Sequence, residues 1–278
     1  MKFLQTTLFF ACYLISQASY AAVTPDAHYI AELFFTTKKS SAYFPDIIKI
    51  NPYLDESLLY EIQKRFVALQ VEDGSSIAGY KGGFIPNAPI GGVLFENGIL
   101  HGPVTINRAN FKSLLIEAEI AFKLCRSISA PIPNIAALKS STCSVYPAVE
   151  LPDAALMDLG QLKQDLVHLR RLLIPTNIAA SHLLLGEGTD PGAVDLDRLD
   201  IKVDLDNTQI GFRNGMGSEN NIWAQVLWVI NNFVIANGYM ITPDQVIIPG
   251  SLTGLHPGRA GSYRVDYGVL GTIEFEVR

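Results

Sequence analysis

Two glutamates that are separated by one residue form the pattern with the clearest chemical potential in this sequence. They are Glu117 and Glu119, and they lie in the apolar run Leu114-Leu115-Ile116-Glu117-Ala118-Glu119-Ile120-Ala121-Phe122, which is typical of a strand. Successive side chains of a strand point to opposite faces, so both carboxylates lie on one face, about 6.6 Å apart along the strand. Two like charges that are this close repel each other, and they stay ionised most easily beside a cation or in water.

A second apolar run carries a lone acid, Glu150, within Val145-Tyr146-Pro147-Ala148-Val149-Glu150-Leu151. If the three carboxylates converge, they form an oxygen-only site that suits a hard divalent cation, Mg²⁺ or Mn²⁺, completed by water and substrate. The alternative is that Glu117 and Glu119 line a solvated sheet face, and Lys123 on the same face fits that interpretation. The alternation of side chains leaves both interpretations open.

The elements that must position these acids are a helical N-terminal part and a β-rich remainder. Thr24-Pro25-Asp26 is a helix start with an N-cap residue followed by proline, and a second helix begins at Asp55 or Ser57. A third, long helix is predicted over 218–237, with Gly238 as its stop. Short β-rich runs punctuated by Gly, Pro and Asn are predicted at 77–82, 92–95, 113–124, 144–151, 178–185, 200–206, 209–213, 245–249 and 263–277.

The order of these elements predicts an α+β fold, because the helices do not alternate with the strands. We expect a signal peptide at 1–21, a helical subdomain at 22–75 and a β-rich catalytic domain at 76–278. Asp206-Asn207, between two of the runs, predicts a hairpin turn. The chain has 278 residues with 21 basic and 27 acidic side chains, a net charge of −6, which argues against a nucleic-acid binder.

The first 21 residues resemble a cleaved export signal. Lys2 is followed by the apolar stretch from Phe3 to Ile15, and Ser19-Tyr20-Ala21 is a small-x-Ala cleavage pattern. The stretch is shorter than the roughly 20 residues of a membrane-spanning helix, and no later segment is long and apolar enough to span. We therefore expect cleavage near Ala21 and a periplasmic protein without a membrane span.

Cleavage at Ala21 would remove Cys12 and leave two cysteines, Cys125 and Cys143. In an oxidising compartment these two could pair and close a short loop. Two buried free thiols are the alternative, because cysteine packs well in a core. The sequence leaves the choice open.

Four motifs in order give the sequence its family resemblance. They are Gly79-Tyr80-Lys81-Gly82-Gly83, Glu117-Ala118-Glu119-Ile120-Ala121-Phe122, Pro147-Ala148-Val149-Glu150-Leu151-Pro152-Asp153 and Gly250-Ser251-Leu252-Thr253. This ordered set resembles the 2-keto-4-pentenoate hydratase group of the fumarylacetoacetate hydrolase superfamily, over roughly residues 25–278. The resemblance implies a mixed β-roll with an N-terminal helical region, and a homo-oligomer.

The resemblance also implies a role for each matching residue. Glu117, Glu119 and Glu150 become ligands of Mg²⁺ or Mn²⁺, and Lys81 becomes an acid/base group. Asp153, which follows the third acid, is a further catalytic candidate. The substrate-binding candidates that the resemblance implies are Ser251 beside the substrate carboxylate, with Asn177 and Ser181 in the pocket wall.

The implied substrate is a small 2-keto acid or 2-hydroxydienoic acid. Such an acid can chelate a cation through its carboxylate and 2-oxygen, and the cation then stabilises the enolate. Hydration, decarboxylation and C–C hydrolysis share this enolate, so the motifs leave the net reaction open, with hydration as the first choice.

Two departures from the family pattern bear on the substrate. The family usually continues its lysine strand with a Thr-Ser pair, whereas this chain has the shorter Phe84-Ile85-Pro86-Asn87-Ala88-Pro89 and neither hydroxyl. The family commonly has Asp-Ser-Arg after its third acid, whereas Ala154-Ala155 follows Asp153 here, so a basic contact is missing. These departures also motivate a further alternative, an exported binding protein that kept the fold and lost the activity.

Overall fold

The computed structural model of this chain describes residues 26–85, 88–157, 159–215 and 221–278. The predicted signal peptide, residues 1–21, lies outside the described residues, as do Thr24 and Pro25 of the predicted helix start. In the described residues, no helix is both long enough and apolar enough to cross a membrane.

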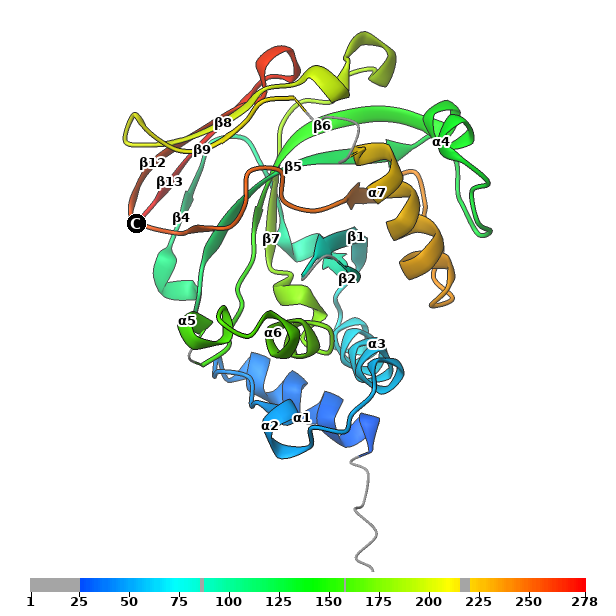
Figure 1. Cartoon of the computed structure of the whole chain (residues 1–278), viewed down its shortest axis with the longest axis vertical. Helices are drawn as coiled ribbons and strands as arrows, with labels where there is room; N and C mark the ends of the chain where they lie inside the picture. Colours follow the sequence, from blue (N-terminus) through cyan, green and yellow to red (C-terminus); the bar gives the residue numbers. More distant parts are fainter. Residues whose placement is uncertain (1–25, 86–87, 158, 216–220) are drawn as a thin grey trace, which may run out of the picture.

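The two helices predicted for the N-terminal part are α1 (Ala27–Lys39) and α3 (Glu56–Glu72), and a short helix that was not predicted, α2 (Ile47–Ile50), lies between them. The Asp26 side chain caps α1 and the Asp55 side chain caps α3, each by accepting a backbone N–H of the first turn. Phe34 of α1 packs edge-on against Phe66 of α3, with ring centroids 6.1 Å apart. The helices lie at one end of the molecule in Figure 1.

The apolar core of these helices is not separate from the rest of the chain. Phe34 and Phe66 belong to the same buried cluster as Ile90 and Leu172, which come from the β-rich part. The predicted boundary near residue 75 therefore divides two patterns of secondary structure that share one core.

The main sheet has eight strands and carries the acids. Seven of them follow the order β2-β1-β10-β5-β6-β7-β3, and β11 pairs with β5 beside this path. The strands are β1 (Ile77–Phe84), β2 (Pro89–Phe95), β3 (Ile99–His101), β5 (Leu115–Leu124), β6 (Thr142–Leu151), β7 (His182–Leu185), β10 (Val246–Ile248) and β11 (His256–Pro257).

A second sheet of five strands, in the order β4-β13-β12-β8-β9, lies toward the opposite end of the molecule from α1–α3 (Figure 1). Its strands are β4 (Val104–Ile106), β8 (Ile201–Leu205), β9 (Thr208–Arg213), β12 (Gly261–Asp266) and β13 (Thr272–Val277). The predicted hairpin turn is confirmed: Asp206 and Asn207 have φ of 48° and 61° between β8 and β9. The single run expected over 263–277 is two antiparallel strands, β12 and β13.

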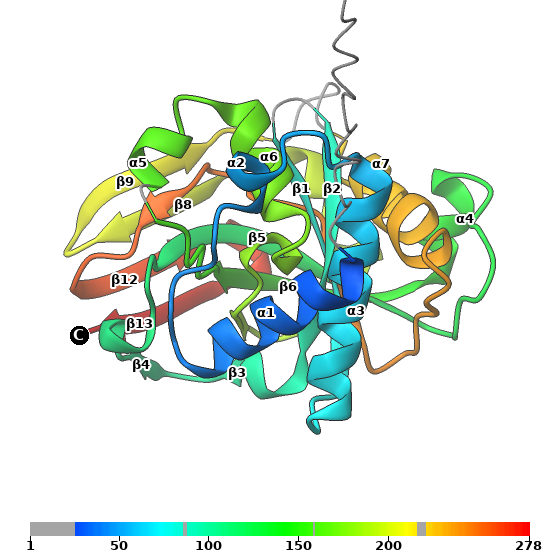
Figure 2. The ribbon, with the colours of Figure 1, turned by 90° about the horizontal axis from the view of Figure 1, so that it is seen from below.

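The remaining α-helices come later in the chain. They are α4 (Ile135–Ser141), α5 (Leu159–Leu162), α6 (Leu166–Leu173) and α7 (Ile222–Trp228), which continues as a π-helical segment, η7 (Val229–Ile235). In the second view α7 lies beside β1 and β2, and α4 lies next to α7 (Figure 2). The predicted long helix is thus confirmed over its described part, and Gly238, with φ of 78°, follows its end. The overall fold is α+β with mixed, strongly curved sheets, as predicted.

The two cysteines left open by the sequence are joined. Cys125 and Cys143 form a disulfide with their Cα atoms 4.9 Å apart, and both residues are exposed. The bond closes an 18-residue separation that contains α4. The alternative of two buried free thiols is therefore wrong.

Candidate metal centre

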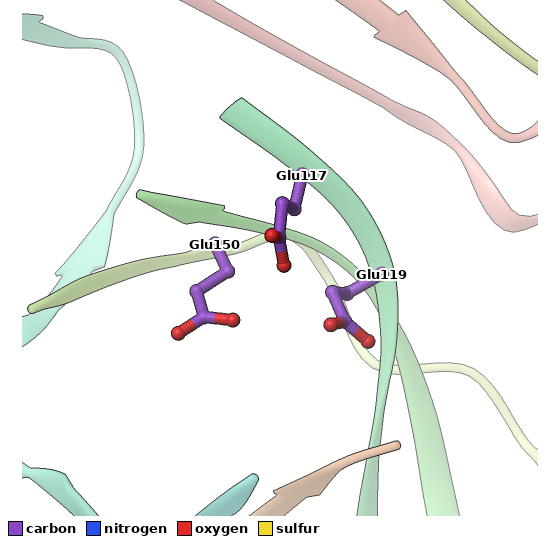
Figure 3. Close-up of side chains that lie close together, drawn as sticks. All are labelled: Glu117, Glu119 and Glu150. Carbon is purple, nitrogen blue, oxygen red and sulfur yellow. The ribbon is translucent and has the colours of Figure 1, made fainter. Parts of the chain in front are cut away.

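The pairing of β5 with β6 brings the three glutamates to one place. These strands are antiparallel, with Glu117 directly opposite Glu150 and Glu119 opposite Ala148. Residues directly opposite each other in a sheet point to the same face, and residues two apart in one strand do so as well. All three carboxylates therefore leave the sheet on one side and point toward a common space (Figure 3).

The three side chains are buried and close together. One carboxylate oxygen of each lies within 4.8 Å of one oxygen of the other two. The exposed fraction is 8% for Glu117 and 0% for Glu119 and Glu150, which excludes the alternative of a solvated sheet face. Oε1 of Glu119 and Oε2 of Glu150 are buried without any hydrogen-bond partner. Such orphaned acceptors are costly unless a ligand completes them.

Burial raises the pKa of all three acids, and repulsion by the neighbouring acids adds to this shift for Glu117 and Glu119. Burial raises the pKa of Glu117 to about 8, with a further contribution from Glu150 that Lys81 opposes. Burial, then the charges of Glu150 and Glu117, raises the pKa of Glu119 well above its usual range. Burial also raises the pKa of Glu150, against the opposing charge of Lys81. A cation at this point would reverse these effects, because it favours the ionised carboxylates.

Lys81 is the basic partner of the acids. It lies on β1 with 4% of its surface exposed, and its ammonium forms an ion pair with Glu150 and donates to the Ile178 carbonyl at 3.0 Å. Three carboxylates and one ammonium leave two negative charges. This is the charge that one divalent cation balances, and an all-oxygen ligand set suits a hard cation such as Mg²⁺ or Mn²⁺.

Two residues from distant parts of the chain hold the Glu119 side chain and the strand opposite it. The Gly250 backbone N–H donates to Glu119 Oε2 at 2.9 Å, and Gly250 has a φ of 136°, which favours glycine. The buried Tyr267 hydroxyl donates to the carbonyl of Ala148, the residue opposite Glu119. Tyr267 follows β12, so the five-stranded sheet contributes to the back of the site.

A strained turn carries the carbonyl that holds Lys81. Asn177, Ile178 and Ala179 have positive φ values of 59°, 44° and 56°, a conformation that costs energy for each non-glycine residue. Asn177 stabilises the turn, since its side chain donates to the Val93 carbonyl at 2.8 Å and accepts from the Val93 N–H at 2.7 Å. A Cβ on the neighbouring Gly92 would come within 2.6 Å of Ile178 Cγ1, so the close approach requires glycine.

Of the three acids, Glu117 opens onto a cavity of about 1240 Å³, and Glu119 and Glu150 do not line it. Among the residues predicted for the site, Lys81, Glu117 and Ser251 line it. Asn177 is buried outside the cavity lining, and its side chain stabilises the strained turn through its two hydrogen bonds with Val93. The Ser181 hydroxyl lies 2.8 Å from His182 Nδ1, and Ser181 does not line this cavity.

The structure does not bring Asp153 into the site. Its carboxylate accepts the backbone N–H groups of Lys112 and Ser113, at 3.0 Å and 2.7 Å. Its two neighbours, Pro152 and Ala154, line the cavity, whereas Asp153 does not. Asp153 therefore stabilises the loop that leads into β5, and its catalytic role stays a prediction.

Sequence reasoning missed three contributors. They are the N–H of Gly250, the Ile178 carbonyl and the Tyr267 hydroxyl. Gly250 stood in a quoted motif, whose serine was taken as the functional residue. The other two act through a strained backbone and a distant hydroxyl, for which the sequence has no local signal.

We compared the sequence and the fold of this chain with those of known proteins. No protein-family model matches this chain. A 2-oxo-hept-4-ene-1,7-dioate hydratase from Escherichia coli is 26% identical over 232 residues, which cover 77% of this chain and 84% of the hydratase.

Solved structures share the fold. A 4-oxalocrotonate decarboxylase from Pseudomonas putida G7, complexed with magnesium and adipate, has a TM-score of 0.81 at 17% identity, covering 91% of this chain and 97% of the decarboxylase. A 2-hydroxyhepta-2,4-diene-1,7-dioate isomerase from Mycobacterium marinum has a TM-score of 0.52 at 16% identity, covering 73% and 76% of the two chains. With the ordered motifs, the sequence relative makes the chain similar to the hydratase and decarboxylase group of the fumarylacetoacetate hydrolase superfamily, and the solved structures show that it shares their fold.

Proposed function

We propose that this chain is a divalent-metal-dependent lyase that hydrates a small 2-hydroxydienoic acid or its 2-keto form. The observation that carries the proposal is the meeting of three buried carboxylates, two of them with orphaned oxygens, beside a buried lysine at the wall of a cavity. The E. coli relative is a hydratase of a 2-oxo acid, and the P. putida decarboxylase was crystallised with magnesium. Both support the same class of reaction.

Glu117, Glu119 and Glu150 are the residues that would hold the metal. When bound there, Mg²⁺ or Mn²⁺ supplies a Lewis acid that stabilises the negative charge of the developing enolate. The orphaned oxygens of Glu119 and Glu150 and the two uncompensated negative charges are what such an ion would satisfy.

Lys81 is proposed to move the proton. Lys81 lines the cavity, and its Nζ is held by Glu150 and by the Ile178 carbonyl. The amine is therefore in a fixed position before the substrate binds. An amine at this position can return a proton when it is protonated and accept one when it is neutral. A positioned acid/base group contributes roughly 10²–10⁴-fold to a rate.

Ser251 is proposed to contact the substrate carboxylate. It lines the cavity, and its hydroxyl donates to the Gly254 carbonyl at 2.8 Å. Binding a carboxylate would require this hydroxyl to turn from Gly254 toward the substrate, because a carboxylate can only accept.

Decarboxylation is the second candidate reaction, favoured by the fold shared with the 4-oxalocrotonate decarboxylase. Both reactions pass through an enolate, and Lys81 could serve either. We also propose export, which the first 21 residues predict, and homo-oligomer formation, which the family resemblance implies. The exposed disulfide supports export, because such bonds persist mainly in oxidising compartments.

Glu119→Gln and Glu150→Gln should each abolish tight binding of Mg²⁺ and Mn²⁺, because each removes a charged oxygen ligand. We expect at least a 100-fold weaker affinity in isothermal titration calorimetry. Glu187→Gln, at an exposed acid outside the cluster, is the matched control and should bind like the wild type. Equal affinity in all four proteins would contradict the assignment.

The stability of the metal-free protein should fall as pH rises from about 5 to 8. Glu117, with a pKa of about 8, and Glu119 keep their protons when folded, whereas an unfolded glutamate loses its proton near pH 4.3. The folded state then binds more protons, so the free energy of unfolding decreases with pH, by up to about 1.4 kcal/mol per unit for each group. Urea unfolding of the wild type and Glu119→Gln at several pH values checks this. The free energy of unfolding should decrease less with pH in the variant, and an equal decrease in both proteins would contradict the prediction.

Lys81→Met should remove turnover and leave metal binding intact, because the methionine fills the volume without carrying a proton. The assay follows 2-hydroxypenta-2,4-dienoate with Mg²⁺. Formation of 4-hydroxy-2-oxopentanoate by the wild type supports hydration, and the variant should be at least 100-fold slower. A variant as fast as the wild type would exclude Lys81 as the acid/base group, and CO₂ release from 4-oxalocrotonate in place of hydration would favour the second candidate.

Export predicts a specific covalent state for the protein expressed from the full sequence. Intact mass spectrometry of the periplasmic fraction should find a chain that begins at Ala22 with Cys125 and Cys143 paired. A cytoplasmic chain that keeps Met1 and has reduced thiols would contradict this part of the proposal.

A further inference from the structure

The cavity in front of the acids is larger than a small keto acid requires. Its volume of about 1240 Å³ exceeds the roughly 300–1,000 Å³ that holds drug-sized ligands. A metal-chelating five-carbon acid would leave most of this space empty. The side chains that line the remaining space therefore bear on the rest of the substrate.

Most of this lining is apolar, and one helix supplies a continuous face of it. Leu166, Leu169 and Leu173 line the cavity from α6, at spacings of three and four residues that place them on one side of a helix. Further apolar side chains come from the end of β1, from α5, from α7 and from the loop after β10. These are Phe84, Ile85, Leu159, Trp228 and Leu255.

The described lining has two cations besides Lys81, and neither forms an enclosed carboxylate site. Lys163 is exposed to solvent. Arg213 directs its guanidinium toward backbone carbonyls, with Nε donating to Gly215 at 3.1 Å and Nη1 to Leu252 at 3.3 Å. A carboxylate carried into the leucine-lined space would lose its hydration without a built partner, which is costly.

Two segments that depart from the family pattern contribute to this wall. Phe84 and Ile85 come from one segment and Ala154 from the other, and all three line the cavity, whereas Ala155 does not. Both segments therefore present apolar atoms to the cavity.

We propose that this enzyme takes 2-oxo acids, or their dienol forms, whose chain beyond the reacting carbons is an alkyl or aryl group and carries no second carboxylate. The proposal rests on the proposed function, because it takes the metal centre as the place where the 2-oxo acid end binds. Each buried methylene should tighten binding about fourfold.

Calorimetry with saturated, unreactive 2-oxo acids in the presence of Mg²⁺ tests the proposal without needing turnover. We expect 2-oxoheptanoate to bind at least tenfold more tightly than 2-oxoheptanedioate of equal chain length, and about 15-fold more tightly than 2-oxopentanoate, which is shorter by two methylenes. The proposal that this part of the substrate is apolar is overturned if the dioate binds as tightly as 2-oxoheptanoate or more tightly, or if affinity does not increase with chain length. Either result leaves the proposed function standing. If none of the three acids binds while Mg²⁺ does, both are overturned.

Two neighbouring residues of α6 give a matched pair of variants. Leu166 lines the cavity and Val167 does not, and both are exposed enough, 44% and 62%, to accept aspartate without disturbing the fold. Leu166→Asp should reduce the preference for 2-oxoheptanoate over 2-oxopentanoate at least threefold, because it places a charge in the apolar wall, and Val167→Asp should leave this ratio unchanged. Equal ratios in the two variants overturn the proposal. The proposal is also overturned if the wild type prefers the dioate and Arg213→Gln loses this preference. Such a result would show that Arg213 binds the second carboxylate.

Discussion

Three carboxylates in a water-poor space cannot all be ionised without compensation, and this electrostatic constraint organises the centre of the molecule. Lys81 compensates one charge through its ion pair with Glu150. The other two charges are balanced by protons, which burial favours by raising the pKa of Glu117 and Glu119, or by a divalent cation. A fold that was optimised for stability alone would place apolar residues at these positions, because buried ionic groups contribute little net stability.

Much of the surrounding structure serves to hold these groups in place. The strained turn at 177–179 directs a carbonyl to Lys81, and the double hydrogen bond of Asn177 with Val93 maintains the strain. Gly250 fixes one oxygen of Glu119, and Tyr267 fixes the strand opposite it. Strain persists only where neighbouring contacts maintain it, and it is found mainly at functional sites. We therefore attribute the strained turn to the positioning of Lys81.

The sequence predicted the acids well because their pattern is local. Alternation along 113–124 was enough to place Glu117 and Glu119 on one face, and the hairpin at Asp206-Asn207 followed from turn chemistry. The register that puts Glu150 opposite Glu117 depends on contacts between distant segments, so periodicity left it open and the ordered motifs were needed. Asp153 lies outside the cavity lining because adjacency to a motif does not determine which way a side chain points, and Asn177 was assigned to the pocket wall although it acts on the backbone behind it.

The central claim is that one divalent cation completes the cluster of Glu117, Glu119 and Glu150. Anomalous diffraction from crystals soaked in Mn²⁺ tests it most directly. The account predicts a single strong manganese peak in contact with an oxygen of all three glutamates, with Lys81 beside it at the cavity wall. Crystals with no peak there, or with the space filled by the Lys81 ammonium at saturating Mn²⁺, would contradict it.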